Sequence, residues 1–291
     1  MTGRFTHFVA IDWSGAKGPR QKGIALAIAD VRGGPPVLVR HDWSREAIQA
    51  VLRDELPPDT LVGVDLGIAL PFADCGAYFP GWDESPDDAP ALWALIDRVA
   101  SEEANFGANS FVAHPSARPF FRDGTQTGVH FGCDGASHGR GRFRVTEKVQ
   151  ANMGCRPYSN FNLVGAAQVG KSSLTGMRML HGLRGKIPVW PVDPLPVTGS
   201  VIVEIYTTLA ALEAGRTPGT AKMRSFEELN RSLTALGSPP VAGEGAIEDH
   251  ASDALLAAAW LRKVAGDRIR WSPAGLTRDI ARTEGWTFGA F

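Results

Sequence analysis

The sequence predicts an α/β fold in which helices flank a mixed β-sheet. Short apolar runs typical of buried strands occur four times in the first 75 residues, and a helical pattern precedes the fourth, which gives the order β-β-β-α-β. Regular patterning returns near residue 200 with another apolar run and an alanine-rich helical segment. Strands joined directly, followed by a strand that comes after a helix, favour a sheet with antiparallel and parallel pairs.

The first three strands are predicted to form an antiparallel meander. Residues 8–11 are apolar and end on Asp12, and a Gly-rich connection leads to a second apolar run at 24–28. The turn sequence Gly33-Gly34-Pro35-Pro36 then precedes a third strand at 37–39.

A helix and a fourth strand are predicted next. Ser44 can cap a helix whose apolar positions share one face, and Pro57-Pro58 ends it. Residues 61–64 form another apolar run, which again ends on an acid, Asp65. Carboxylates are therefore expected at the ends of the first and fourth strands.

The whole chain, residues 1–291, is predicted to be one domain with its core in residues 1–75 and 200–265. In residues 76–199 Gly and Pro are frequent and strand periodicity is weak, so we interpret this region as a large insertion between the fourth and fifth core strands.

The fifth strand is expected at residues 201–205, with Glu204 in its middle. Helical patterns follow it at residues 209–214, 226–236 and 249–261. The alanine and leucine content of the last of these suits close packing against a sheet.

Composition points to an ordinary globular protein. Hydrophobic residues make up 44% of the chain and charged residues 21%, and no apolar run approaches the roughly 18 to 20 residues that a membrane span needs. The three cysteines are scattered, which fits a reducing compartment, so we expect a cytoplasmic protein without a membrane partner. The net charge of −1 gives no global positive field, so any nucleic-acid binding must depend on local patches.

Four acidic residues stand where charge is costly. Asp12 and Asp65 end apolar strands, Glu204 interrupts one, and Asp253 precedes an apolar helical face. Divalent Mg²⁺ or Mn²⁺, which prefer oxygen ligands, would compensate these charges. Two such ions can hold the attacking and leaving oxygens of a phosphoryl displacement. We therefore expect the four carboxylates to act as metal ligands and catalytic groups.

Simpler explanations exist for some of these acids. Asp12 can cap the turn that follows it, and we interpret Asp249 as a helix cap. Glu204 is the hardest to explain this way, because an ionised residue between Val and Ile is rarely buried without a partner. Asp249, His250 and Asp253 share one helix face, which makes His250 a candidate accessory ligand or proton-transfer group.

The sequence resembles an uncharacterised family of predicted RNase-H-like nucleases, the domain of unknown function 429. The matching stretches are Val9-Ala10-Ile11-Asp12-Trp13-Ser14-Gly15, Val62-Gly63-Val64-Asp65-Leu66-Gly67 with Pro71, Val203-Glu204-Ile205-Tyr206, and His250-Ala251-Ser252-Asp253-Ala254. The resemblance implies an RNase-H-like fold with a two-metal nuclease site at these acids. Thr207 stands where the family usually has Pro, a departure that concerns strand termination more than metal binding.

The segment around His250 and Asp253 is also similar to the C-terminal helix of RuvC-type Holliday junction resolvases, in which an Asp or His precedes the Asp by three residues. Such enzymes pair up on a two-fold substrate, so a homodimer is possible by analogy at the level of the fold.

The family's Arg-x-Thr-Glu element is matched by Arg144-Val145-Thr146-Glu147. Arg144 could hold a phosphate bidentately, with Glu147 positioning it or joining the metal site. The alternative is an exposed ion pair at a helix start. A basic cluster of Arg140, Arg142, Arg144 and Lys148 could likewise contact phosphates or be a solvated loop.

Two other motifs suggest different functions, nucleotide binding and zinc binding. Residues 165–172 fit the Walker A expression, but the strand before them is short and poor, so we interpret the match as chance while keeping Lys171 as a candidate phosphate ligand. His130, Cys133 and His138 lack a fourth zinc partner at suitable spacing, and we interpret them as loop residues.

The sequence thus predicts a metal-dependent phosphodiester hydrolase acting on nucleic acid or a nucleotide. One alternative is an actin-like phosphotransferase or ATPase, in which the Gly-rich turn after the first strand, including Ser14 and Gly15, would bind phosphates. Another is a non-catalytic RNase-H-like scaffold that keeps its acids for metal-stabilised folding. The sequence does not distinguish DNA, RNA and small nucleotides, or one metal ion from two.

Overall fold

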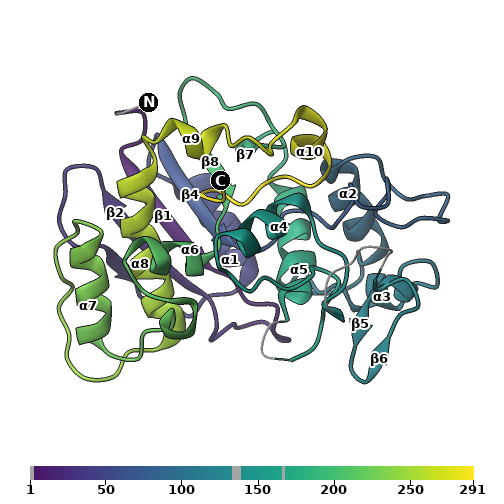
Figure 1. The fold of residues 1–291 in the computed structure, drawn as a ribbon, viewed down its shortest axis with the longest axis horizontal. Coiled ribbons are helices and arrows are strands. Elements are labelled where there is room, and N and C mark those ends of the chain that lie inside the picture. Colours follow the sequence, from purple (N-terminus) through teal and green to yellow (C-terminus); the bar gives the residue numbers. More distant parts are fainter. Residues whose placement is uncertain (1–2, 133–138, 166–167) are drawn as a thin grey trace.

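A six-stranded mixed sheet forms the centre of the protein in a computed structural model that describes residues 3–132, 139–165 and 168–291 (Figure 1). The strand order across the sheet is β3-β2-β1-β4-β8-β7. The strands are β1 (His7–Asp12), β2 (Ala25–Asp30), β3 (Val37–Val39), β4 (Thr60–Asp65), β7 (Val189–Trp190) and β8 (Val201–Glu204). The predicted α/β fold with a mixed sheet flanked by helices is confirmed.

Strand directions follow from the connections. β1, β2 and β3 form the predicted antiparallel meander. The helix α1 (Arg45–Ala50), which continues as a π-helical turn over Val51–Glu55, then allows β4 to return parallel to β1. Ser44 caps α1 through its side chain, as predicted. β8 pairs in parallel with β4, and β7 with β8, so the carboxyl ends of β1, β4 and β8 lie at one edge.

Alternating side chains of the strands enter two separate hydrophobic cores. Val9, Ile11 and Val62 face a core shared with α2 (Ala89–Val99) and α5 (Val169–Gly182). Phe8 and Ala10 face the opposite core, which contains much of α8 (Asp249–Val264). The side of the sheet to which each strand-end acid points therefore follows from its position in this alternation.

Residues 76–199 supply much of the first core and one edge of the sheet. Besides α2 and α5 they form α3 (Asn109–Ala113), a 3₁₀ turn over Arg118–Phe120, the hairpin of β5 (Arg122–Asp123) and β6 (Gln126–Thr127), and α4 (Val145–Asn152). Their strand β7, beside two prolines, lies at the sheet edge, where proline is tolerated. The β5–β6 hairpin lies at the opposite end of the molecule from α7 (Phe226–Ala235) (Figure 1).

The C-terminal third of the chain packs on the second face. It contains α6 (Thr207–Glu213), a 3₁₀ turn over Pro218–Thr220, α7, α8, α9 (Arg268–Trp271) and α10 (Arg278–Thr283). Asp249, which we expected to cap a helix, is instead the first residue of α8, and Glu248 precedes it as the cap. None of the helices in the described residues is long and apolar enough to cross a membrane.

Substitution of Gly63 tests how tightly β4 packs against Ile205 and α8. A Cβ at this position would lie 2.7 Å from Ile205 Cγ2 and 2.8 Å from Leu261 Cδ1. We expect Gly63→Ala to lower the free energy of unfolding by about 1–3 kcal/mol, because the added methyl overpacks the core. Gly219→Ala, where the nearest atom to the added Cβ would be Thr217 Oγ1 at 4.0 Å, is the control. Urea denaturation measures both, and an equal loss in the two variants would contradict the tight packing.

Candidate active site

Asp12 and Asp65 are neighbours at the edge where parallel strands end. They are the last residues of β1 and β4, and they pair directly across the two strands. Asp12 alternates with Ala10 and Asp65 with Leu61, whose side chains belong to the core that contains α8. Both carboxylates therefore lie on the α8 side of the sheet.

Helix α8 adds an imidazole and a third carboxylate. His250 Nδ1 lies 2.6 Å from Asp12 Oδ2, and in the tautomer protonated at Nδ1 the imidazole donates this hydrogen bond. The side chain of His250 is 48% exposed, whereas that of Asp12 is 12% exposed, so the pair opens to solvent through the imidazole. Asp253 follows His250 by three residues, on the same face of the helix.

The three carboxylates are poorly compensated. Burial raises the pKa of Asp65 well above its ordinary value, and the charges of Asp12 and Asp253 raise it further. Burial, with the charge of Asp12, also raises the pKa of Asp253 to about 7. The pKa of Asp12 is raised by burial despite its bond to His250. Each group would hold its negative charge more readily if a cation joined them.

Two neighbouring residues were not expected from the sequence. Lys222 Nζ lies 2.8 Å from Asp249 Oδ2 and contributes positive charge near Asp12 and Asp253. Thr207, at the position where the resembled family has Pro, donates its hydroxyl to Asp65 Oδ2 at 3.1 Å. The departure from the family pattern is the only signal that pointed to Thr207, and nothing in the pattern around Lys222 marked it.

Ser14 lies at the border of this cluster. Both Ser14 and His250 approach Gly23, where an added Cβ would be 3.1 Å from Ser14 Oγ and 3.2 Å from His250 Nε2. Gly23 thus leaves room for the two polar side chains to lie near each other. The sequence-predicted Ser14 is therefore brought near His250, at the border of the carboxylate cluster.

Glu204 is not brought to this cluster. Its position in β8 alternates with Ile202, which faces the core shared with α2 and α5, so its side chain leaves the sheet on the opposite side from Asp12 and Asp65. Its oxygens are occupied by Arg144 at 2.6 and 2.8 Å, by the Ile68 amide at 2.8 Å and by the Thr287 hydroxyl. Glu204 is a buried structural acid in this arrangement.

Arg144 has no donor left for a phosphate. Its side chain is 1% exposed, and its five N–H groups are directed at Glu204, Glu147 and the carbonyl oxygen of Glu284. Glu147 also accepts the Arg144 backbone amide, and burial raises its pKa. The expected Arg144–Glu147 ion pair therefore exists, but it is buried rather than exposed, and it lies away from Asp12.

Arg142 is buried too, bound to Asp74 and to backbone carbonyl oxygens, so it belongs to no solvated loop. Of the three zinc candidates, Cys133 and His138 lie outside the described residues. No group of three or more His, Cys, Asp or Glu side chains within the described ranges has the arrangement of a ready-made metal site.

Gly15 and Lys171 meet away from the carboxylates. A Cβ on Gly15 would lie 2.5 Å from the Lys171 carbonyl carbon, so the turn after β1 is packed against the first turn of α5. Residues 170–172 of the Walker A match lie in that first turn, and Leu163 before them forms no strand. Part of the match, residues 166–167, lies outside the described residues.

Comparisons of the chain with protein-family models, with curated proteins and with solved structures found no match.

The metal-free protein should respond to the protonation of Asp253. Because its folded pKa of about 7 exceeds the ordinary value of 3.8, neutral Asp253 stabilises the fold fully below about pH 4, and this contribution is lost as the pH rises through 7. We expect Asp253→Asn in EDTA to raise the free energy of unfolding at pH 8 by at most about 4 kcal/mol, and to change it little at pH 4.5.

Thermal and urea denaturation of both proteins at the two pH values measure this difference. Asp83→Asn, which changes an exposed acid, is the control. Equal effects of the two substitutions at pH 8 would show that Asp253 carries no buried charge.

Removal of Arg144 should leave two buried carboxylates, those of Glu147 and Glu204, without their cation. We expect Arg144→Met to lower the free energy of unfolding by at least about 3–5 kcal/mol, the usual cost of breaking a buried ion pair. Arg98→Met is the control, because Arg98 and Glu84 are more than half exposed and such surface pairs contribute less than about 1 kcal/mol. Guanidinium denaturation of the two variants would refute the assignment if their losses were the same.

Proposed function

We propose that this protein is a metal-dependent phosphodiester hydrolase whose fold is RNase-H-like. The proposed metal ligands are Asp12, Asp65 and Asp253, with His250 as an accessory group. Glu204, expected from the sequence as a fourth ligand, is left out because its carboxylate is held by Arg144 on the other face of the sheet.

The strand arrangement supports the fold assignment. An antiparallel meander of β1, β2 and β3 is followed by a helix and by β4, which lies parallel to β1. Acids end β1 and β4, and the long helix α8 near the C-terminus packs across β1 and β2 with His250 and Asp253 at its start. These are the features that the resemblance to RNase-H-like nucleases led us to expect.

The uncompensated charge of three partly buried carboxylates is the main support for a metal site. Glu204 shows how this chain neutralises a buried acid when it uses a side chain, with a guanidinium at 2.6 Å. In the described residues Asp12, Asp65 and Asp253 have no such arginine; they have His250, a threonine hydroxyl and the nearby Lys222. A set of oxygen donors with excess negative charge suits Mg²⁺ or Mn²⁺ better than softer metals.

The residues have distinct roles in the proposed reaction. A divalent ion bound here would supply Lewis-acid stabilisation of the phosphoryl oxygens. Side-chain rotation must bring the three carboxylates together, since they form no ready-made metal site. His250, half exposed and bonded to Asp12, is positioned to take a proton from an attacking water, and Asp12 orients its ring. Lys222 adds positive charge for an anionic substrate.

The decisive experiment combines metal binding with cleavage. We expect Mn²⁺ to bind in calorimetry at pH 7.5, and Asp12→Asn or Asp253→Asn to weaken that binding at least 10-fold. Cleavage should be tested on single-stranded and double-stranded DNA and RNA, a branched junction, dinucleotides and ATP. The same substitutions should lower any Mn²⁺-dependent cleavage at least 100-fold, because they remove an essential ligand.

Two controls sharpen this test. Asp83→Asn, in an exposed acid, should bind Mn²⁺ as the wild type does. Glu204→Gln, if circular dichroism shows it folded, should also retain Mn²⁺ binding, which separates three ligands from the four that the sequence suggests. Mn²⁺ binding that is absent or indifferent to Asp12→Asn would overturn the proposal, and phosphate release from ATP alone would favour the phosphotransferase alternative.

A further inference from the structure

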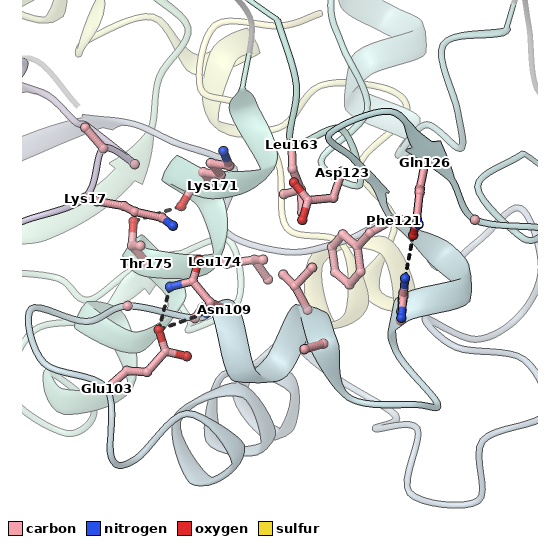
Figure 2. Close-up of a pocket in the computed structure, with 18 of the residues that line it drawn as sticks. Lys17, Glu103, Asn109, Phe121, Asp123, Gln126, Leu163, Lys171, Leu174 and Thr175 are labelled. Atoms are coloured by element: carbon pink, nitrogen blue, oxygen red, sulfur yellow. Dashed lines mark hydrogen bonds between the residues drawn. The ribbon is translucent and has the colours of Figure 1, made fainter.

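A cavity of about 710 Å³ lies between the turn after β1, the helices α3 and α5, and the β5–β6 hairpin. Its volume falls in the range of small-molecule sites, roughly 300–1,000 Å³. Figure 2 shows Lys17 and Lys171 on one side of this cavity and Phe121, Asp123 and Gln126 on the other. None of the proposed metal ligands lines it, so it is a second candidate site.

Positive charge predominates in the lining. Within the described residues neither Lys17 nor Lys171 forms an ion pair or a side-chain hydrogen bond through its ammonium group. Among the described residues, the Arg118 side chain donates only to the neutral amide oxygen of Gln126. Of the two acids in the lining, Glu103 is occupied by the amides and side chains of Asn109 and Ser110 at 2.5–3.0 Å.

Arg45 adds a buried cation that pairs with no acid in the part of the chain that the structure describes. It is 2% exposed, and it donates to the carbonyl oxygens of Ser14 at 2.9 Å, of Asn105 at 2.5 Å and of Ala16. Burial lowers its pKa to about 10, so the guanidinium stays charged at neutral pH. These bonds also join two walls of the cavity, the turn after β1 and the loop before α3. The site is therefore built before a ligand arrives, and it favours an anion.

The rest of the lining suits a flat polar ring. Phe121, Leu163 and Leu174, each at most 3% exposed, form a buried apolar wall, and the carboxylate of Asp123, which accepts no hydrogen bond within the described residues, lies beside it (Figure 2). An alkyl chain would bury the Asp123 carboxylate without a hydrogen bond, which is costly. A heteroaromatic base with exocyclic amino groups can pack against this apolar wall and donate to Asp123.

We propose that this cavity binds a nucleotide unit, with its phosphate at Lys17 and Lys171 and its base against Phe121 near Asp123. The unit belongs either to a free mononucleotide or to the end of an oligonucleotide. This site goes beyond the proposed hydrolase and does not depend on it. Binding is therefore to be measured in EDTA, and Asp12→Asn should leave it unchanged.

The test is calorimetric titration with adenosine 5′-monophosphate (AMP), inorganic phosphate and an adenine tetranucleotide carrying a 5′-phosphate. We expect AMP to bind at least 10-fold more tightly than phosphate. The double variant Lys17→Ala/Lys171→Ala should weaken AMP binding at least 10-fold, whereas Lys186→Ala, an exposed lysine beyond the far end of α5, should not. Asp123→Ala should reduce the preference for AMP over uridine 5′-monophosphate without abolishing binding.

The two sources of the nucleotide give different results. If the tetranucleotide binds at least 10-fold more tightly than AMP and AMP displaces it, the cavity holds the end of a nucleic acid; if AMP binds as well or better, it holds a free nucleotide. The proposal is overturned if neither compound binds, if phosphate binds as tightly as AMP, or if the double lysine variant binds AMP like the wild type. Loss of Mn²⁺ binding in Asp12→Asn with AMP binding retained would separate this site from the carboxylate cluster.

Discussion

Arg144 joins four parts of the chain that are distant in sequence. Through its own side chain it binds Glu147 in α4, Glu204 in β8 and the carbonyl oxygen of Glu284 after α10. Glu284 in turn accepts the amides of Phe72 and Ala73, and Glu204 accepts that of Ile68, all in the loop after β4. A buried cation among three acids is stable only when every donor is used, so these segments must be placed together. The carboxyl edge of the sheet is fixed by this arrangement.

The acids at this edge of the sheet are compensated differently on the two faces. On one face Glu204 is neutralised by an arginine and fully hydrogen-bonded. On the other, Asp12, Asp65 and Asp253 repel one another and are raised in pKa chiefly by burial. The ion pair of Glu204 with Arg144 has a structural explanation, because this pair holds the C-terminal segment in place. The three aspartates on the other face lower the stability of the metal-free fold. A chain retains such destabilising groups most readily where a bound ligand offsets the loss of stability.

The strands β1, β2, β3, β4 and β8 were predictable because each is a short apolar run, and the proximity of Asp12 to Asp65 was expected from two strands that end on acids. β7 was not predicted, because it has only two residues and lies between prolines. The role of Glu204 was not predictable in this way. Its side depends on the register of β8, and its partner Arg144 is 60 residues away in a region without clear periodicity. The roles of Arg142 and Arg144 were not predictable either. Their arginine-rich sequence is typical of a solvated loop, and only the structure shows that both side chains are buried. Lys222 approaches the site only through the packing of its loop near α8.

The turn between β1 and β2 separates the two candidate sites and connects them. Asp12 belongs to the carboxylate cluster and Ser14 lies at its border. Gly15 and Lys17, one and three residues after Ser14, line the cavity. Arg45 holds this turn through two of its carbonyl oxygens. A ligand that moved the backbone of this turn would have to break those hydrogen bonds, which cost about 1–3 kcal/mol each when left unmade. The turn is therefore rigid, and binding in the cavity can influence Asp12 through charge more readily than through movement.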